Sequence, residues 1–316
     1  MTISSKDEEV KFQYAYTLAQ QRQIELAVKF IKNEILEANP ENYKSWHLLA
    51  LCESIKENKD TAFKIVSSVL QAMQEAYNEN KLGKNDRWQF IHLKLTQLGI
   101  IDDMFGVNDS LELLPEVFEL FADLFPESEQ IKLGSEPNQT KEYLLQAIWL
   151  FACKLYLRNG NFKEAQDALK ESLNVKTDFK NLNNNLARGY LSLQDRNSAA
   201  LTEFESVLFY DPMNVDAIVG FAKLIFPEIG ETADYKQSPL QTQHKTDQIF
   251  ANDEDRSAAC ASLKLMLEQV VENSIDGYHS PEVWWYLSQI YEQYGDSDRL
   301  EASLWNCVKF EELEPI

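Results

Sequence analysis

The histidines are the first side chains in this 316-residue chain that could carry acid-base catalysis or bind a metal. They are His47, His92, His244 and His279. None has a second ligand at helical spacing, so the sequence contains no zinc motif. It also contains no glycine cluster after a strand for binding phosphate and no Gly-x-Ser-x-Gly turn. We therefore predict no enzymatic activity, no cofactor and no metal.

The cysteines are equally unpromising as reactive groups. Cys52, Cys153, Cys260 and Cys307 are widely separated, and each takes a place suited to a small apolar residue on a helix. Neither metal-ligand spacing nor a dense disulfide framework is present. We expect four structural thiols in a reducing compartment.

Two adjacent tryptophans, Trp284 and Trp285, are better candidates for binding than any residue is for catalysis. One face of a helix cannot bury both neighbours. If Trp284 fills the packing position, Trp285 remains for a partner, since aromatic residues are enriched at interface hot spots. The alternative is that Trp285 packs on a neighbouring helix or covers one end of the fold.

The apolar pattern around these tryptophans recurs along the chain. Trp284, Leu287, Ser288, Tyr291 and Gly295 repeat the spacing that starts at Trp149, and a similar window starts at Tyr43. Bulky residues early in one helix and small residues where two helices cross are typical of the tetratricopeptide repeat. The sequence therefore predicts an all-α fold, a superhelix of antiparallel helix pairs.

We predict a single tetratricopeptide array over residues 1–316. Its repeats lie near 8–41, 43–78, 86–126, 146–179, 181–213, 215–273 and 281–314. The repeat at 86–126 lacks the alanines expected at a helix crossing and is a divergent pair. The repeat at 215–273 is interrupted by a polar insertion near 228–255, which we interpret as a mobile loop because of its length and composition.

The inner groove of such an array is lined by the first helix of each pair. The alignment predicts that this groove contains Leu150, Lys154, Leu157, Asn185, Val219, Lys223, Trp285, Gln289 and Glu292. A carboxylate clamp like that of chaperone-binding tetratricopeptide domains would need these positions to form one basic pocket. The asparagine-rich start at Asn181 to Asn185 is explained as well by helix capping.

Composition and charge restrict the partners. The chain carries 51 acidic and 30 basic residues and a net charge of -21, which disfavours direct binding to nucleic acid or to an anionic membrane. Its amino terminus is unlike a signal peptide, and no stretch has the roughly 20 apolar residues of a membrane span. We expect a cytoplasmic protein whose partners are proteins.

Two segments resemble the tetratricopeptide adaptor of the plasma-membrane phosphatidylinositol 4-kinase complex. They are Tyr14 to Leu70 and Pro281 to Pro315; the run Gln20-Gln21-Arg22-Gln23-Ile24, followed by His47 to Leu51, is the most particular part. The resemblance covers the carboxy-terminal half of that family, of the fungal cargo-transport and endocytosis type. The helical half that precedes these repeats in the family is absent here, so the chain is a fragment or a shortened relative.

The resemblance implies a non-enzymatic scaffold. Its partners would be phosphatidylinositol 4-kinase and a palmitoylated peripheral membrane anchor, and its location the inner face of the plasma membrane, reached through those partners. It would support phosphatidylinositol 4-phosphate synthesis and membrane trafficking. Two alternatives remain: another cytosolic scaffold (in trafficking, RNA surveillance or ubiquitin-ligase assembly), or a peptide-binding cochaperone domain.

Overall fold

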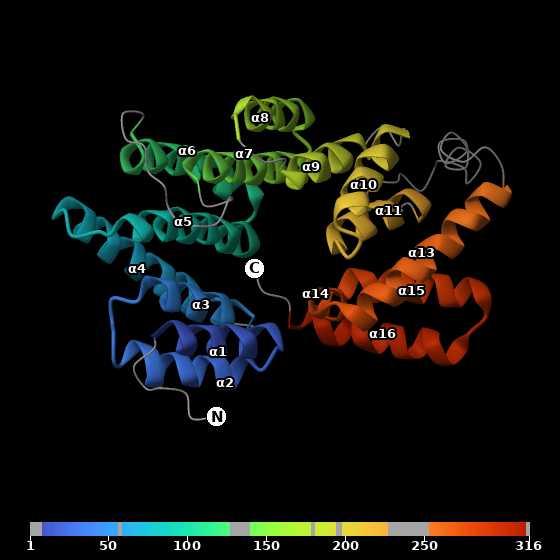
Figure 1. The fold of residues 1–316 in the computed structure, drawn as a ribbon, viewed down its shortest axis with the longest axis horizontal. Coiled ribbons are helices and arrows are strands. Elements are labelled where there is room, and N and C mark those ends of the chain that lie inside the picture. The colour runs from blue at the N-terminus through green and yellow to red at the C-terminus, as the bar shows by residue number, and fades with distance from the viewer. Residues whose placement is uncertain are drawn as a thin grey trace. The chain divides into compact units, whose positions relative to one another are not determined.

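The structure is a computed structural model that describes residues 8–55, 59–126, 140–177, 181–193, 198–226 and 253–313 (Figure 1). Throughout these ranges the regular elements are helices and none is a β-strand, which confirms the all-α prediction. The chain divides near residue 180 into two compact units. The single continuous array stays a prediction, and each unit is described by itself.

Unit 1 is built from helices that pack in consecutive pairs. Its elements are α1 (Glu8–Gln20), α2 (Ile24–Phe30), the π-helical turn η1 (Ile31–Leu36), α3 (Tyr43–Ser54), α4 (Asp60–Asn78), α5 (Lys84–Phe105), α6 (Val107–Leu124), α7 (Lys141–Arg158) and α8 (Phe162–Asn174). α1 packs on α2 and η1, and the following pairs are α3 with α4, α5 with α6, and α7 with α8. The first helices α1, α3, α5 and α7 also contact one another in that order, as the repeat pattern predicts.

Unit 2 follows the same plan. Its helices are α9 (Leu182–Ser192), α10 (Ser198–Tyr210), α11 (Val215–Ile225), α13 (Asp253–Asn273), α14 (Ile275–His279), α15 (Pro281–Tyr294) and α16 (Ser297–Glu311). The pairs are α9 with α10, α11 with α13, and α15 with α16, and the first helices α9, α11 and α15 again contact in order.

The predicted insertion near 228–255 lies outside the described residues as far as residue 252. Its last residues belong to α13, which begins at Asp253.

Small residues stand where paired helices cross. Seven alanines of the paired helices are fully buried: Ala15, Ala27, Ala50, Ala62, Ala152, Ala165 and Ala200. In the divergent pair, α5 with α6, the buried Ser110 lies at the crossing, and its hydroxyl donates to the carbonyl of Leu98 at 2.6 Å. A residue without a long side chain lets two helix backbones approach at the density of a protein core.

Two helix starts are fastened in the same way. The side chain of Asn42 caps α3, and that of Ser280 caps α15. Four residues after each cap, a tryptophan indole donates back across the junction: Trp46 to the carbonyl of Pro40 at 2.8 Å, and Trp284 to the carbonyl of Tyr278 at 2.7 Å. We call this arrangement the indole clasp. It satisfies the indole donor and fixes the entry of the chain into the first helix.

The cysteines are free thiols, and three of the four are buried. Burial raises the pKa of the Cys153 thiol to about 11, so it is neutral at physiological pH. Among the described helices, none combines the length and the apolar character needed to cross a membrane.

Candidate partner-binding groove

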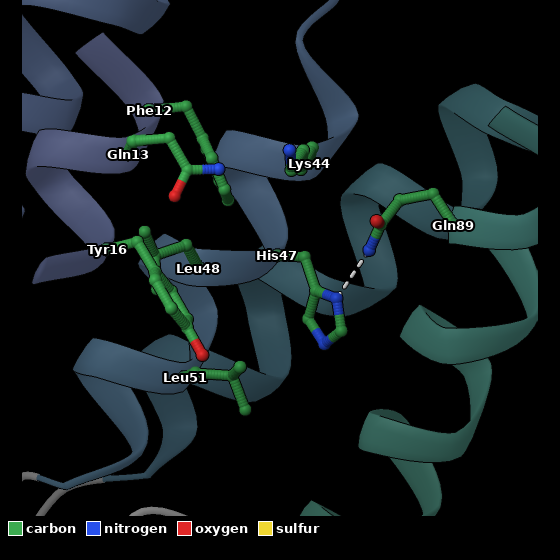
Figure 2. Close-up of a pocket in the computed structure, with 8 residues that line it drawn as sticks. All are labelled: Phe12, Gln13, Tyr16, Lys44, His47, Leu48, Leu51 and Gln89. Atoms are coloured by element: carbon green, nitrogen blue, oxygen red, sulfur yellow. Dashed lines mark hydrogen bonds between the residues drawn. The ribbon is translucent and has the colours of Figure 1, made fainter. Parts of the chain in front are cut away.

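A cavity of about 330 Å³ lies on the first helices of three successive pairs in unit 1 (Figure 2). α1 contributes Phe12, Gln13 and Tyr16, α3 contributes Lys44, His47, Leu48 and Leu51, and α5 contributes Gln89. The residues of α1 and α3 recur every three or four positions, so each set shares one helix face. We call this cavity the α1/α3/α5 groove.

His47 holds the polar side of the groove together. Its Nδ1 contacts the amide nitrogen of Gln89 (Figure 2). Its Nε2 lies 2.7 Å from the hydroxyl oxygen of Thr96. An amide N–H can only donate, so Nδ1 is the acceptor and Nε2 carries the proton. The ring is therefore a neutral imidazole whose two nitrogens both tie α3 to α5.

Burial keeps this histidine uncharged. Desolvation, assisted by the nearby His92, lowers the pKa of His47 to about 4, and desolvation lowers the pKa of His92 to about 4 as well. Nε2 of His92 is buried without a hydrogen-bond partner in the structure. At neutral pH this side of the groove offers amide and imidazole groups and no net charge.

The one cation in the groove lining is already compensated. The ammonium group of Lys44 lies 3.1 Å from a carboxylate oxygen of Glu9 and 3.9 Å from the centre of the Phe12 ring. Hydrogen bonds from Gln13 and Lys44 hold the pKa of Glu9 below its ordinary value. The groove is therefore mostly apolar and nearly neutral.

These properties match a segment of polypeptide better than a charged metabolite. Tyr16 is 42% exposed and, with Leu48 and Leu51, forms an apolar wall that an incoming side chain could cover. Gln13 and Gln89 supply amide groups, which can both donate to and accept from a peptide backbone. Among the described residues, no group of three or more histidine, cysteine or acidic side chains could hold a metal ion.

The sequence-predicted groove residues fall into two sets, one in each unit. Leu150, Lys154 and Leu157 lie on α7 of unit 1, where the leucines are half-buried and the lysine is exposed. The remaining six residues belong to unit 2.

Val219 does not line a groove, and this prediction was wrong. Its side chain is only 1% exposed, because α11 contacts α9, α10, α13 and α15 and is buried on almost every side. The alignment placed Val219 on the correct helix but treated that helix as half-exposed.

Two other predicted groove residues are bound by acidic neighbours within unit 2. Lys223 is half-buried and forms an ion pair with Glu282 at 3.1 Å. Asn185 is half-buried and donates to Glu203 at 2.7 Å, and Arg188 reaches the other oxygen of Glu203 at 2.8 Å. The amide and cationic groups that a carboxylate clamp would need in this unit are thus already bound by the chain's own carboxylates. This disfavours a clamp for a partner's carboxylate.

Trp285, Gln289 and Glu292 share the outer face of α15. Trp285 is 44% exposed and Glu292 is exposed, whereas Gln289 is half-buried. Trp284, in contrast, is half-buried and held by its clasp. This geometry leaves Trp285 available to a partner.

Sequence reasoning missed the α1/α3/α5 groove, although a signal for it existed. Aligning Trp46 with Trp284 places His47 on Trp285 and Leu51 on Gln289. Both His47 and Leu51 line the groove. The alignment of first-helix positions therefore held the information, but it was applied only to the later repeats and not to the two amino-terminal pairs.

Fold and groove together define an all-α protein of paired helices whose first helices line a cavity of about 330 Å³ in unit 1. Residues 1–191 match the family described as the YPP1 middle domain, and residues 204–316 match the YPP1 C-terminal domain. The chain belongs to the YPP1 family.

Similar proteins carry the same family name. The chain is 51% identical over 327 residues to the cargo-transport protein YPP1 of Eremothecium gossypii, in an alignment that covers all of this chain and 44% of the relative. It is 53% identical over 319 residues to cargo-transport protein YPP1 of Saccharomyces cerevisiae, covering 98% of the chain and 39% of the relative. The chain thus spans less than half the length of these relatives.

A solved structure agrees with the fold. The crystal structure of Ypp1 superimposes with a TM-score of 0.83 at 51% identity, over 98% of this chain and 37% of that one.

Proposed function

We propose that this chain acts in a non-enzymatic adaptor that links a phosphatidylinositol 4-kinase to a palmitoylated peripheral anchor at the inner face of the plasma membrane. In this role it supports phosphatidylinositol 4-phosphate synthesis and membrane trafficking. The observation that carries the adaptor part is the α1/α3/α5 groove, which is largely apolar, nearly neutral and lined by backbone-compatible amides. The names of its relatives support trafficking, and the resemblance of Tyr14 to Leu70 and Pro281 to Pro315 supplies the two partners.

The acidic balance of the chain supports an indirect route to the membrane. With a net charge of -21, the protein is repelled by an anionic leaflet, so a separate anchor would supply the membrane contact. Another cytosolic scaffold remains the alternative. The cochaperone alternative is weakened by the acidic partners of Lys223 and Arg188.

The test is affinity capture of the chain from cytosol and from detergent-solubilised membranes at physiological salt, with co-purifying proteins identified. We expect the lipid kinase or its membrane anchor. Recovery of chaperones, or of an unrelated assembly, would retire the kinase link and leave the fold unaffected.

A pair of tyrosine variants on α1 makes this capture specific for the groove. Tyr16→Ala removes a groove wall, and we expect a loss of about tenfold in partner capture. Tyr14→Ala is the matched control: Tyr14 is 44% exposed on the same helix, but its ring packs on Phe30 outside the groove lining. Equal losses from both variants would remove the groove from the proposal.

A further inference from the structure

The outer face of α16 carries three exposed apolar side chains. Leu304, Trp305 and Val308 are 39%, 69% and 54% exposed. Val308 lies one turn after both Leu304 and Trp305, so the three side chains together span about 100° of the helix surface. Scattered single apolar residues on a surface need no explanation, but a contiguous group that includes a largely exposed tryptophan marks an interaction site.

The opposite face of α16 is fully used by the core of unit 2. Ser303 is 1% exposed and Phe310 is 2% exposed. The Phe310 ring packs edge-on against Tyr278 and His279, with ring centres 5.2 and 5.1 Å apart. The outer apolar group is therefore a second surface of the helix, separate from the one that folds it.

Acidic residues stand at both ends of this outer group. Glu301 lies one turn before Trp305, and Glu312 lies one turn after Val308, with Glu311 beside it; all three are exposed. Glu312 follows Glu301 by eleven positions, about 16 Å along a helix. The arrangement is an apolar centre between two acidic ends.

In the described part of the chain, Arg299 and Lys309, the basic residues of α16, form no ion pair with Glu301, Glu311 or Glu312. Arg299 is engaged by Glu268 at 3.3 Å and by Asp296 at 3.6 Å. Lys309 lies over the ring of Phe310, 4.7 Å from its centre. The acidic ends remain open to a partner's cations.

We propose that the outer face of α16 binds an amphipathic helix of a partner protein. That helix presents an apolar stripe to Leu304, Trp305 and Val308, with lysine or arginine at each end, spaced to meet Glu301 and the pair Glu311 and Glu312. The proposal rests on the adaptor function in one respect, that the chain works by binding other proteins.

Charge favours a basic amphipathic helix over a second copy of the chain and over a lipid surface. A second copy of the chain would bring like charges together: a two-fold axis across the helix would place Glu301 opposite Glu312, and an axis along it would place Glu301 opposite Glu301. An anionic lipid surface is disfavoured because the acidic ends would face its headgroups. A basic amphipathic helix satisfies both the apolar centre and the acidic ends.

The test is site-specific photocrosslinking in cells that produce the full-length protein. Trp305 is replaced by the photoreactive residue benzoylphenylalanine, and the crosslinked segment is identified by mass spectrometry. The control position is Leu265 on α13, which is 56% exposed in the same unit. A second protein carries Glu301→Lys with Glu312→Lys, and its matched control carries Glu205→Lys with Glu272→Lys, two exposed glutamates elsewhere in unit 2.

The proposal predicts a crosslink from position 305 to a helical segment of another protein with basic residues at both ends of an apolar stripe. It also predicts that reversing Glu301 and Glu312 lowers the crosslink yield at least tenfold, while the control pair does not. A crosslink to lipid, to a second copy or to a segment without basic ends overturns it, as does a yield no higher than that from position 265.

The same experiment separates this proposal from the proposed function. A crosslink from position 305 to a basic helix of a protein unrelated to lipid kinases or their anchors supports the proposed α16 surface and contradicts the link to the kinase. Capture of the kinase or anchor without a crosslink from position 305 supports the proposed function and contradicts the α16 surface.

Discussion

Helices α3 and α15 occupy the same place in two repeats, but the residue that follows the clasp tryptophan has a different role in each helix. His47 is drawn into the α1/α3/α5 groove and bonded on both ring nitrogens, whereas Trp285 is left 44% exposed. The repeat fixes which position faces outward from the helix pair. The residue chosen there decides whether the surface is closed by hydrogen bonds or left open to a partner.

The charges two residues before the tryptophan are also reversed between the two helices. Lys44 of α3 pairs with Glu9 of α1, and Glu282 of α15 pairs with Lys223 of α11. In each case the cation lies over an aromatic ring, that of Phe12 or Tyr190. The first helices of neighbouring pairs are thus joined by similar ion pairs of opposite polarity.

The largest expected contrast is in the response to acid. The pKa values of His47 and His92 are lowered to about 4 in the folded state, so the unfolded chain binds more protons below the ordinary value of 6.5. The contribution of the two histidines to the free energy of unfolding is fully present above pH 6.5. It is lost as the pH decreases toward 4, by about 3 kcal/mol for each histidine. Urea denaturation from pH 7 to pH 4 measures it.

His47→Gln serves as the control for that contrast, because it removes one titrating ring and should flatten the curve by about 3 kcal/mol. An unchanged pH dependence in His47→Gln would show that the ring is not held neutral by the fold.

Next in size is the loss of an indole clasp. We expect Trp46→Ala and Trp284→Ala each to lower the free energy of unfolding by about 3 kcal/mol, since both remove packing and a donor to a junction carbonyl. Trp285→Ala should cost less than about 1 kcal/mol, since exposed substitutions have small effects. Similar losses in the free energy of unfolding for Trp284→Ala and Trp285→Ala would contradict the assignment of Trp284 to packing and of Trp285 to the exposed surface.

Partner binding should reverse the order of those two variants. Trp285→Ala is expected to weaken capture of a protein partner by about 2 kcal/mol and to leave the melting temperature nearly unchanged. Titration calorimetry or quantitative capture measures the first quantity, and a thermal scan measures the second. A large drop in melting temperature with intact capture would show that Trp285 is a packing residue.

The smallest effect concerns the reversed ion pairs. Lys44→Gln and Glu282→Gln should each change the free energy of unfolding by less than about 1 kcal/mol, because all four partners are partly exposed to solvent. The effect should shrink further in 1 M salt. A larger loss from either variant, insensitive to salt, would mean that the pair is more than a surface contact.

The sequence predicted the helices well because the buried alanines and the clasp tryptophans recur with a fixed spacing. It predicted the groove poorly. Val219 was misplaced because burial of α11 depends on four neighbouring helices, which a one-helix pattern cannot show. The α1/α3/α5 groove was missed because His47 looked like an isolated histidine until Gln89 and Thr96, more than forty residues away, were seen to complete it.

The indole clasp makes two junctions of the chain intolerant of any change in length. The hydrogen bonds from Trp46 to Pro40 and from Trp284 to Tyr278 each span six residues. One added residue between carbonyl and indole would turn the tryptophan roughly 100° around its helix and move the donor out of reach. Length variation among related chains should therefore avoid these two short stretches, which can serve as fixed points for aligning distant members.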